Sequence, residues 1–189
     1  RDLSYPAGVF AEGAESFRAV SAGGSFSVLL DSEGGVWTCG TNANGQLGAG
    51  MEISADSFAS TLVRVKGVGG EGYLENIVQI RATENSAIAL DADGYVYAWG
   101  SNYYGCLGEG RQVSNSAVPV AVQTEGGTPL GNIASIDACD KNAMALSKDG
   151  TVYVWGSNMF GQRGDGTYEL TERITRAVRV SYFEENGIS

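Results

Sequence analysis

The chain has 189 residues, of which 43% are hydrophobic, so it can form one domain or a large part of one. Its 22 acidic and 12 basic residues give a formal charge of −10, which argues against nucleic acid as a partner, because binding to phosphate usually needs a basic patch. The sequence has no histidine and no apolar run of about 18 residues, which excludes Ser/His and Cys/His catalytic pairs, disfavours zinc and argues against a membrane span.

A long block occurs three times along the chain. Its copies end in GVWTCGTNANGQLGAG, GYVYAWGSNYYGCLGEG and GTVYVWGSNMFGQRGDG, at residues 35–50, 94–110 and 150–166. A second matching segment precedes each of these, at residues 19–34, 79–94 and 135–150. A looser third element lies at 61–67, 117–124 and 176–182, and the last copy is expected to open a further, incomplete repeat. A fixed period of this length indicates a repeat architecture.

The hydrophobic pattern inside each copy is that of β-strands. Short apolar runs such as SAIALD end in an Asp/Gly or Ser/Gly turn and are followed by a second run such as VYAWG, which predicts a β-hairpin. With the flanking segments each repeat offers about four strands, the content of a propeller blade. No sustained helical period occurs, so we predict little helix. The predicted core contains Leu30, Val36, Leu90, Val96, Trp99, Leu146, Val152 and Trp155.

We therefore predict an all-β fold of propeller blades, with three four-stranded repeats and part of a fourth, in one repeat domain over residues 1–189. The expected boundaries are about 3–57, 58–113 and 114–168, with the start of a fourth repeat at 169–189. Because the chain starts at Arg1 and this fourth repeat is cut short, we expect the sequence to be a piece of a longer one. Further blades or self-association would then complete a ring.

The three cysteines cannot form a complete set of internal disulfides, because their number is odd. Cys39 occupies the position of Trp99 and Trp155, and Cys139 that of Gly23, so both are expected to be small buried residues. Cys106 replaces the glutamines of the other two loops and is expected to be the most exposed of the three.

Several motifs that could carry chemistry are better explained by structure. The glycine-rich loops are not followed by a helix, so they are not dinucleotide fingerprints, and the Asp/Gly turn at 91–94 lacks the later ligands of a calcium loop. Glu109 and Asp165 occupy equivalent loops of different repeats, too far apart for a general acid/base pair. Arg173, Arg176 and Arg179 are interpreted as a solvated edge strand. The sequence thus predicts no catalytic, metal-binding or cofactor-binding residue.

These blocks resemble the repeat of the regulator of chromosome condensation family, over most of residues 17–182. The resemblance rests on the glycine positions of each copy, on Asn42, Asn102 and Asn158, and on Trp99 and Trp155. It departs from the family pattern where Phe26, Ser86 and Asn142 replace a histidine, where Cys39 replaces the tryptophan, and where Arg163 replaces a leucine. The resemblance implies propeller blades, which in this family typically close a ring of seven. It also implies action through protein contacts, as in exchange factors for a small GTPase, chromatin-binding modules, substrate-recognition parts of ubiquitin ligases and inhibitors of a β-lactamase.

The candidate binding residues occupy the positions that vary between the three copies of the repeated loop. Tyr103 and Met159 are equivalent to each other, as are Tyr104 and Phe160. Tyrosine and methionine are frequent in protein-binding patches, so all four are candidates for a partner site on one rim, whereas internal packing is the alternative for each.

The sequence therefore favours a non-enzymatic protein–protein interaction scaffold that needs no cofactor and binds an unknown protein partner through its rim loops. The alternative is a structural repeat segment of a larger surface or adhesin-like protein. A light-sensing function, known for a relative that uses tryptophan clusters, is disfavoured because Trp99 and Trp155 occupy ordinary core positions of the repeat.

Overall fold

The computed structural model describes residues 16–111, 115–168 and 173–180, and within them the chain forms three four-stranded antiparallel sheets. The strands of each sheet follow one another in chain order. The first sheet contains β1 (Phe17–Ala22), β2 (Phe26–Asp31), β3 (Val36–Thr41) and β4 (Phe58–Arg64); the second contains β5 (Ile77–Ala82), β6 (Ser86–Asp91), β7 (Val96–Gly100) and β8 (Ser116–Ala121); the third contains β9 (Ile133–Cys139), β10 (Asn142–Ser147), β11 (Val152–Ser157) and β12 (Arg173–Arg179). A single 3-10 turn, η1 (Val68–Gly70), is the only helical element of the described part.

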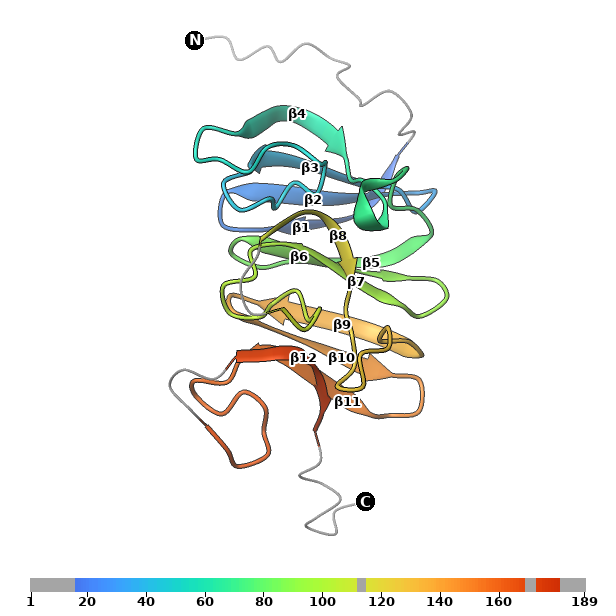
Figure 1. Ribbon diagram of the computed structural model, residues 1–189. Coiled ribbons are helices and arrows are strands. Elements are labelled where there is room, and N and C mark those ends of the chain that lie inside the picture. Colours follow the sequence, from blue (N-terminus) through green and yellow to red (C-terminus); the bar gives the residue numbers. More distant parts are fainter. Residues whose placement is uncertain (1–15, 112–114, 169–172, 181–189) are drawn as a thin grey trace.

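The three sheets stack face to face in chain order and do not close into a ring (Figure 1). The first strands of neighbouring sheets are linked directly: Gln79 Oε1 accepts a hydrogen bond from Ile136 N at 3.1 Å, and Arg81 pairs with Asp137 at 3.1 Å. The prediction of an all-β, incomplete propeller is confirmed. In the described part no helix is long and apolar enough to cross a membrane.

Each sheet is built around the predicted hairpin, and in the first two sheets the aspartate that ends the second strand holds the turn. Asp31 Oδ1 accepts a hydrogen bond from Gly35 N at 2.7 Å, and its Oδ2 accepts one from Trp37 Nε1 at 2.8 Å. Asp91 does the same for Tyr95 N and for the hydroxyl of Tyr97. Burial and the Asp91 hydrogen bond raise the pKa of Tyr97 to about 12. Both carboxylates of these aspartates therefore accept hydrogen bonds within their own hairpins.

Two hydrophobic cores lie between the three sheets. Val28, Leu30 and Val36 of the first sheet pack against Ile80 and Trp99 of the second. The second sheet then presents its opposite side, with Ile88, Leu90 and Val96, to Ile136 and Trp155 of the third. The second sheet is therefore covered on both faces. Burial of these side chains is the main force that joins the blades.

Two of the eight predicted core residues are not buried. Leu146 is 44% exposed and Val152 is half-buried, whereas the other six are buried. The prediction for this pair is wrong because both side chains point away from the second sheet, and no further sheet of the described residues covers that side of the third. The burial of a blade residue depends on the next blade as much as on its own strand.

The boundaries of the sheets are shifted along the chain relative to the boundaries of the sequence repeat. Strand β4 pairs with β3 and β12 pairs with β11, so each closes the sheet that precedes it in the chain. Residues 173–179 therefore complete the third sheet, although the sequence pattern indicated the opening strand of a fourth repeat. The predicted segment 169–189 also includes residues that lie outside the described ones.

The cysteines are all free, but their environments differ from those expected. Cys106 is buried, because its loop packs against the turn of the third sheet and its thiol donates a hydrogen bond to Lys141 O at 3.2 Å. Burial and, to a smaller extent, the Asp140 charge raise the pKa of this thiol to about 12. Cys139 is exposed and Cys39 half-buried, so the burial expected for these two is wrong for Cys139 and only partial for Cys39.

Candidate functional site

The repeated loops follow the third strand of each sheet and share one internal geometry. The Oδ1 atoms of Asn42, Asn102 and Asn158 each accept a hydrogen bond from the backbone N–H five residues later, at 3.1, 3.1 and 2.9 Å. Equivalent glycines follow with positive φ, for example 63° at Gly48 and 62° at Gly108, a conformation that side chains with a Cβ atom disfavour. The repeat signature therefore encodes a rigid loop shape.

Each of the first two loops docks on the next sheet through a tryptophan. Trp99 Nε1 donates a hydrogen bond to the backbone oxygen of Gln46 at 3.0 Å, and Trp155 Nε1 donates one to that of Cys106 at 2.9 Å. A Cβ atom on Gly48 would lie 2.7 Å from the Trp99 ring, so the missing side chain lets the indole reach the loop. The glycines of the signature thus let neighbouring blades approach each other closely.

Two of the four candidate residues, Tyr103 and Tyr104, form an aromatic ladder on the rim. Their rings meet edge to face, with centroids 4.8 Å apart. Arg173 Cζ lies 4.7 Å from the centre of the Tyr103 ring, and Lys141 Nζ lies 4.9 Å from that of Tyr104. Both cations belong to the third sheet, so the ladder also holds the second loop onto the next blade. The nearby Asp140 charge, followed by Tyr104, raises the pKa of Lys141.

Met159 and Phe160 lie in the equivalent positions of the third loop. Phe160 is 84% exposed and Met159 is half-buried, whereas Tyr103 is 58% exposed. All are more exposed than Leu107 and Trp99, which are fully buried, as the sequence predicted for Tyr103 and Met159. The structure brings Tyr103 and Tyr104 into direct contact, while Met159 and Phe160 lie on the next loop.

The two cations of the ladder were not predicted from the sequence. Lys141 lies in the turn between β9 and β10, and Arg173 begins β12, so only the folded sheet brings both to the second loop. Arg173 was assigned to a solvated edge strand, and β12 is indeed the edge strand of its sheet. A lysine in the turn that faces an aromatic loop position is the only sequence signal that could have indicated this contact.

The acidic residues of the loops are engaged locally. Glu109 lies 3.6 Å from Arg111, and Asp165 lies 2.7 Å from Arg163, each within its own loop. Each carboxylate therefore has a basic partner beside it. Within residues 16–111, 115–168 and 173–180, no cluster of three or more His, Cys, Asp or Glu side chains could hold a metal ion.

Family models identify the repeat. The models described as "Regulator of chromosome condensation (RCC1) repeat" match residues 93–146 in one version and 17–46, 77–106 and 133–162 in another. The three short matches run from the first strand of each sheet into its loop, so the model recognises the elements described above.

Curated relatives share about a third of the aligned residues. The chain is 34% identical to the probable E3 ubiquitin-protein ligase HERC6 of Homo sapiens, over 89% of the chain and 16% of that protein. It is 33% identical to the RCC2 homolog of Xenopus laevis, over 87% of the chain and 30% of that protein. It is 31% identical to the ultraviolet-B receptor UVR8 of Arabidopsis thaliana, over 89% of the chain and 36% of the receptor. The chain thus spans only a minor part of these relatives.

Solved structures show the same fold. The chain superposes on human WBSCR16 with a TM-score of 0.67 and 22% identity, over 86% of the chain and 37% of that structure. For Prp20p of Saccharomyces cerevisiae the TM-score is 0.66 and the identity 19%, over 89% of the chain and 39% of that structure. Sheet topology, loop geometry and the family match agree: the chain belongs to the regulator of chromosome condensation repeat family.

Proposed function

We propose that this chain is a non-enzymatic protein-interaction scaffold that binds a partner protein through its rim loops, at Tyr103, Tyr104, Met159 and Phe160. The observation that carries the proposal is the exposure of Tyr103 and Phe160 on loops that share one hydrogen-bonded backbone geometry. Rigid exposed aromatic side chains are frequent anchors of protein interfaces, because they bury a large area at little cost in conformational entropy.

A role without catalysis is consistent with the chemistry of the loops. Glu109 and Asp165 pair with neighbouring arginines, and the buried Cys106 thiol has a raised pKa, so these groups are not poised as acids, bases or nucleophiles. One relative is a ligase, but the chain corresponds to only 16% of its length. Its activity is therefore not carried over to this repeat region.

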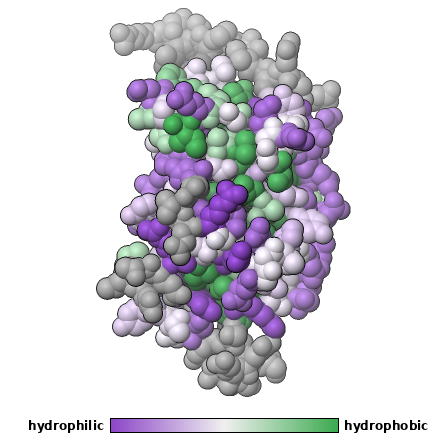
Figure 2. Space-filling model, in the orientation of Figure 1, coloured by the Kyte–Doolittle hydropathy of each residue, from purple (hydrophilic) through white to green (hydrophobic). Residues whose placement is uncertain are grey.

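The identity of the partner is not inferred from the relatives. The Prp20p structure is described with binding to Gsp1p and histones, and we carry over only the mode of action, in which a propeller of this family contacts proteins. Further blades of a longer chain, or a second copy, would be additional partners at the ends of the stack. Hydrophobic residues on the visible side lie in several small areas between hydrophilic ones (Figure 2), which suits specific local contacts.

The test compares capture of partner proteins by the full chain and by matched variants. The double change Tyr103→Ser and Phe160→Ser removes the two most exposed candidate aromatics. The control, Tyr95→Ser, removes a 44% exposed tyrosine from the turn between β6 and β7. This turn lies at the end of β7 opposite to the candidate loop. Cross-linking with mass spectrometry should identify a protein that both wild type and control bind and the double variant loses. Equal binding by all three proteins would refute the rim site, and no bound protein at all would favour the structural-segment alternative.

A further inference from the structure

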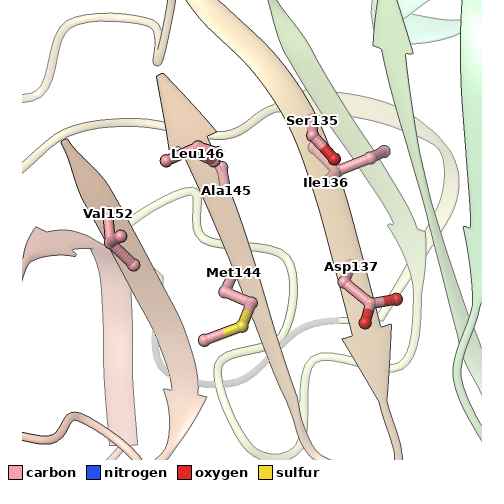
Figure 3. A pocket seen from close by; sticks show the side chains of 7 residues that line it. All are labelled: Ser135, Ile136, Asp137, Met144, Ala145, Leu146 and Val152. Carbon is pink, nitrogen blue, oxygen red and sulfur yellow. The ribbon is translucent and has the colours of Figure 1, made fainter. Parts of the chain in front are cut away.

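A polar hollow lies along β12, the edge strand of the third sheet. It differs from the apolar hollow on the same sheet, where Met144, Leu146 and Val152 leave a volume of about 340 Å³ (Figure 3). The polar hollow has a volume of about 320 Å³ and is open to solvent. Its lining residues are Glu125, Arg163, Ile174, Thr175, Arg176 and Val178. A hollow of this size with charged side chains in its wall can receive a polar side chain or a small ligand.

Three segments of the chain meet at the polar hollow and fix its shape. The second loop reaches β12, because Gly110 N donates a hydrogen bond to Thr175 O at 2.7 Å. The segment that links the second and third sheets also reaches β12, because Ala177 N donates a hydrogen bond to Gln123 O at 2.8 Å. The hollow is therefore built across the boundary between two blades, and backbone hydrogen bonds hold its frame.

Arginine occupies two positions of this hollow that are apolar in the other blades. The pairing of β8 and β12 with their neighbours makes Val118 the counterpart of Arg176. Arg163 is the counterpart of Leu47 and Leu107, which are both fully buried. Withdrawing a charged group from water costs free energy unless the group gains a partner, so packing alone does not explain two arginines here.

The two arginines differ in their partners. Arg163 Nε lies 2.7 Å from Asp165 Oδ2, so its charge is offset within its own loop. The Arg176 guanidinium forms no hydrogen bond or ion pair with residues 16–111, 115–168 and 173–180, and its Nε is buried. The backbone neighbour Glu109 directs its carboxylate to Arg111 instead, at 3.6 Å. The terminal nitrogens of Arg176 are not buried, so they are open to a ligand, and partial loss of water strengthens their attraction for an anion.

Gly110 gives the Arg176 guanidinium a fixed place. A Cβ atom on Gly110 would lie 2.6 Å from Nε and 2.7 Å from Cζ of Arg176, so the guanidinium packs directly against this glycine. Gly50 is the equivalent glycine of the first loop, and there Val118 Cγ1 lies at 3.8 Å. The cation is thus positioned before a ligand arrives, which lowers the entropic cost of binding.

The charges around the hollow favour a monoanion over a dianion. Glu125 lines the same hollow, and Asp165 already offsets Arg163. A phosphate dianion would therefore be repelled by a carboxylate while one unpaired guanidinium holds it, whereas a carboxylate group needs only one guanidinium. The buried side chains of Ile174 and Val178 add an apolar wall, which suits the methylene groups of an acidic side chain.

We propose that the polar hollow binds a carboxylate side chain of a partner protein, and that Arg176 is the residue that holds it. The partner would present an exposed acidic segment with apolar neighbours. This inference rests on the proposed role as a protein-interaction scaffold, but the site is separate from the rim residues Tyr103 and Phe160.

The test titrates the full chain, with isotope-labelled arginine, with the peptide acetyl-Leu-Glu-Leu amide and with its glutamine analogue. NMR follows the Nε–H signal of Arg176, which is assigned by its loss in Arg176→Lys. The glutamate peptide should shift this signal saturably, and the glutamine peptide should bind about tenfold more weakly or worse. Arg64 is the internal control: its Nε is also buried, but its Nη2 pairs with Glu75 at 3.0 Å, so its signal should not move.

Three variants locate the binding by saturation transfer to the peptide. Arg176→Gln should abolish binding, and its backbone amide spectrum shows whether it is folded. Glu125→Gln, at an exposed position, should tighten binding about twofold or more, because a like charge is removed. The double variant Tyr103→Ser and Phe160→Ser should bind the peptide as wild type does, so failure of the rim site and failure of this site are distinguishable.

Several results would overturn the proposal. They are the absence of a saturable shift with the glutamate peptide, equal binding of both peptides, full binding by folded Arg176→Gln, and weaker binding by Glu125→Gln. Saturation of the Arg176 signal by acetate or inorganic phosphate at lower concentrations than the peptide would also overturn it, because the site would then select a small anion and not a side chain of a protein.

Discussion

Trp155 Nε1 donates a hydrogen bond to the backbone oxygen of Cys106 at 2.9 Å and thereby joins β11 to the loop that follows β7 of the neighbouring sheet. The same bond links Trp99 to Gln46 at 3.0 Å. The tryptophan of the repeat therefore does two things: its ring fills the space between two sheets, and its N–H fixes the loop of the preceding blade. Phenylalanine could provide only the first of these, which gives a physical reason for tryptophan at this position.

Replacement of Trp155 by alanine should lower the free energy of unfolding by about 3–5 kcal/mol, because the side chain is fully buried and leaves a large cavity. Trp155→Phe should cost less but still about 1 kcal/mol, since the Cys106 oxygen loses its donor. Urea denaturation of both variants measures the two contributions. Tyr168→Ala, at a position that is 70% exposed, is the control and should leave the midpoint unchanged. An unaltered midpoint for Trp155→Ala would show that Trp155 does not join the second and third blades as described.

Gly108→Ala should destabilise the protein by about 1–3 kcal/mol. The backbone φ of Gly108 is 62°, and a Cβ atom there would lie 2.7 Å from Val122 and 3.1 Å from Trp155. The substitution therefore combines backbone strain with a displaced indole. Gly126→Ala is the matched control, because its nearest neighbour would be 3.8 Å away and its φ is not left-handed. Thermal unfolding should separate the two variants, and similar melting temperatures would contradict this explanation.

The sequence predicted the burial of side chains where burial depends on a single repeat. It did not predict burial that depends on the contact between two repeats. Leu90, Val96 and Trp99 were predicted to be buried from alternation and from the repeat pattern, and they are. Leu146 and Val152 have the same pattern, yet their exposure depends on whether another sheet covers the third one. No local pattern contains that information.

In the candidate site, too, the sequence predicted what depends on one loop but not the contacts between two blades. Exposure of Tyr103 followed from its place in the loop, but its contact with Arg173 joins positions 70 residues apart, counted from 103 to 173. The burial of Cys106 likewise comes from the turn of the next blade, whose Lys141 oxygen accepts its thiol hydrogen bond. Side chains that act across a blade boundary need the packed structure to be identified.

Asp149 should remain ionised to lower pH than an ordinary aspartate, because hydrogen bonds from the Ser147 hydroxyl and then from Thr151 hold its pKa below the usual value. A lowered pKa in the folded state stabilises the fold above the pKa of the unfolded chain, and this stabilisation is lost as the pH falls through the folded pKa. Carboxylate NMR titration measures the shift directly. Ser147→Ala should raise the pKa of Asp149 toward its ordinary value, and an unchanged titration would exclude the Ser147 hydroxyl as the main cause.

The three thiols should differ sharply in reactivity toward iodoacetamide. Cys139 is exposed and should react quickly in the folded protein, whereas Cys106 is buried and has a pKa of about 12, so almost none of it is the reactive thiolate at pH 8. Peptide mass spectrometry of the native protein should therefore find label on Cys139 and little on Cys106 until denaturant is added. Cys139→Ser should remove the fast phase.

The same raised pKa makes stability depend on alkaline pH. The unfolded thiol ionises near its ordinary value of 9.0, while the folded one keeps its proton to about 12. The contribution of Cys106 to stability is thus complete below about pH 9 and is lost as the pH rises toward 12. Cys106→Ser should reduce this alkaline loss. Labelling of Cys106 as fast as Cys139 in native buffer would mean that the second loop does not stay docked on the third blade.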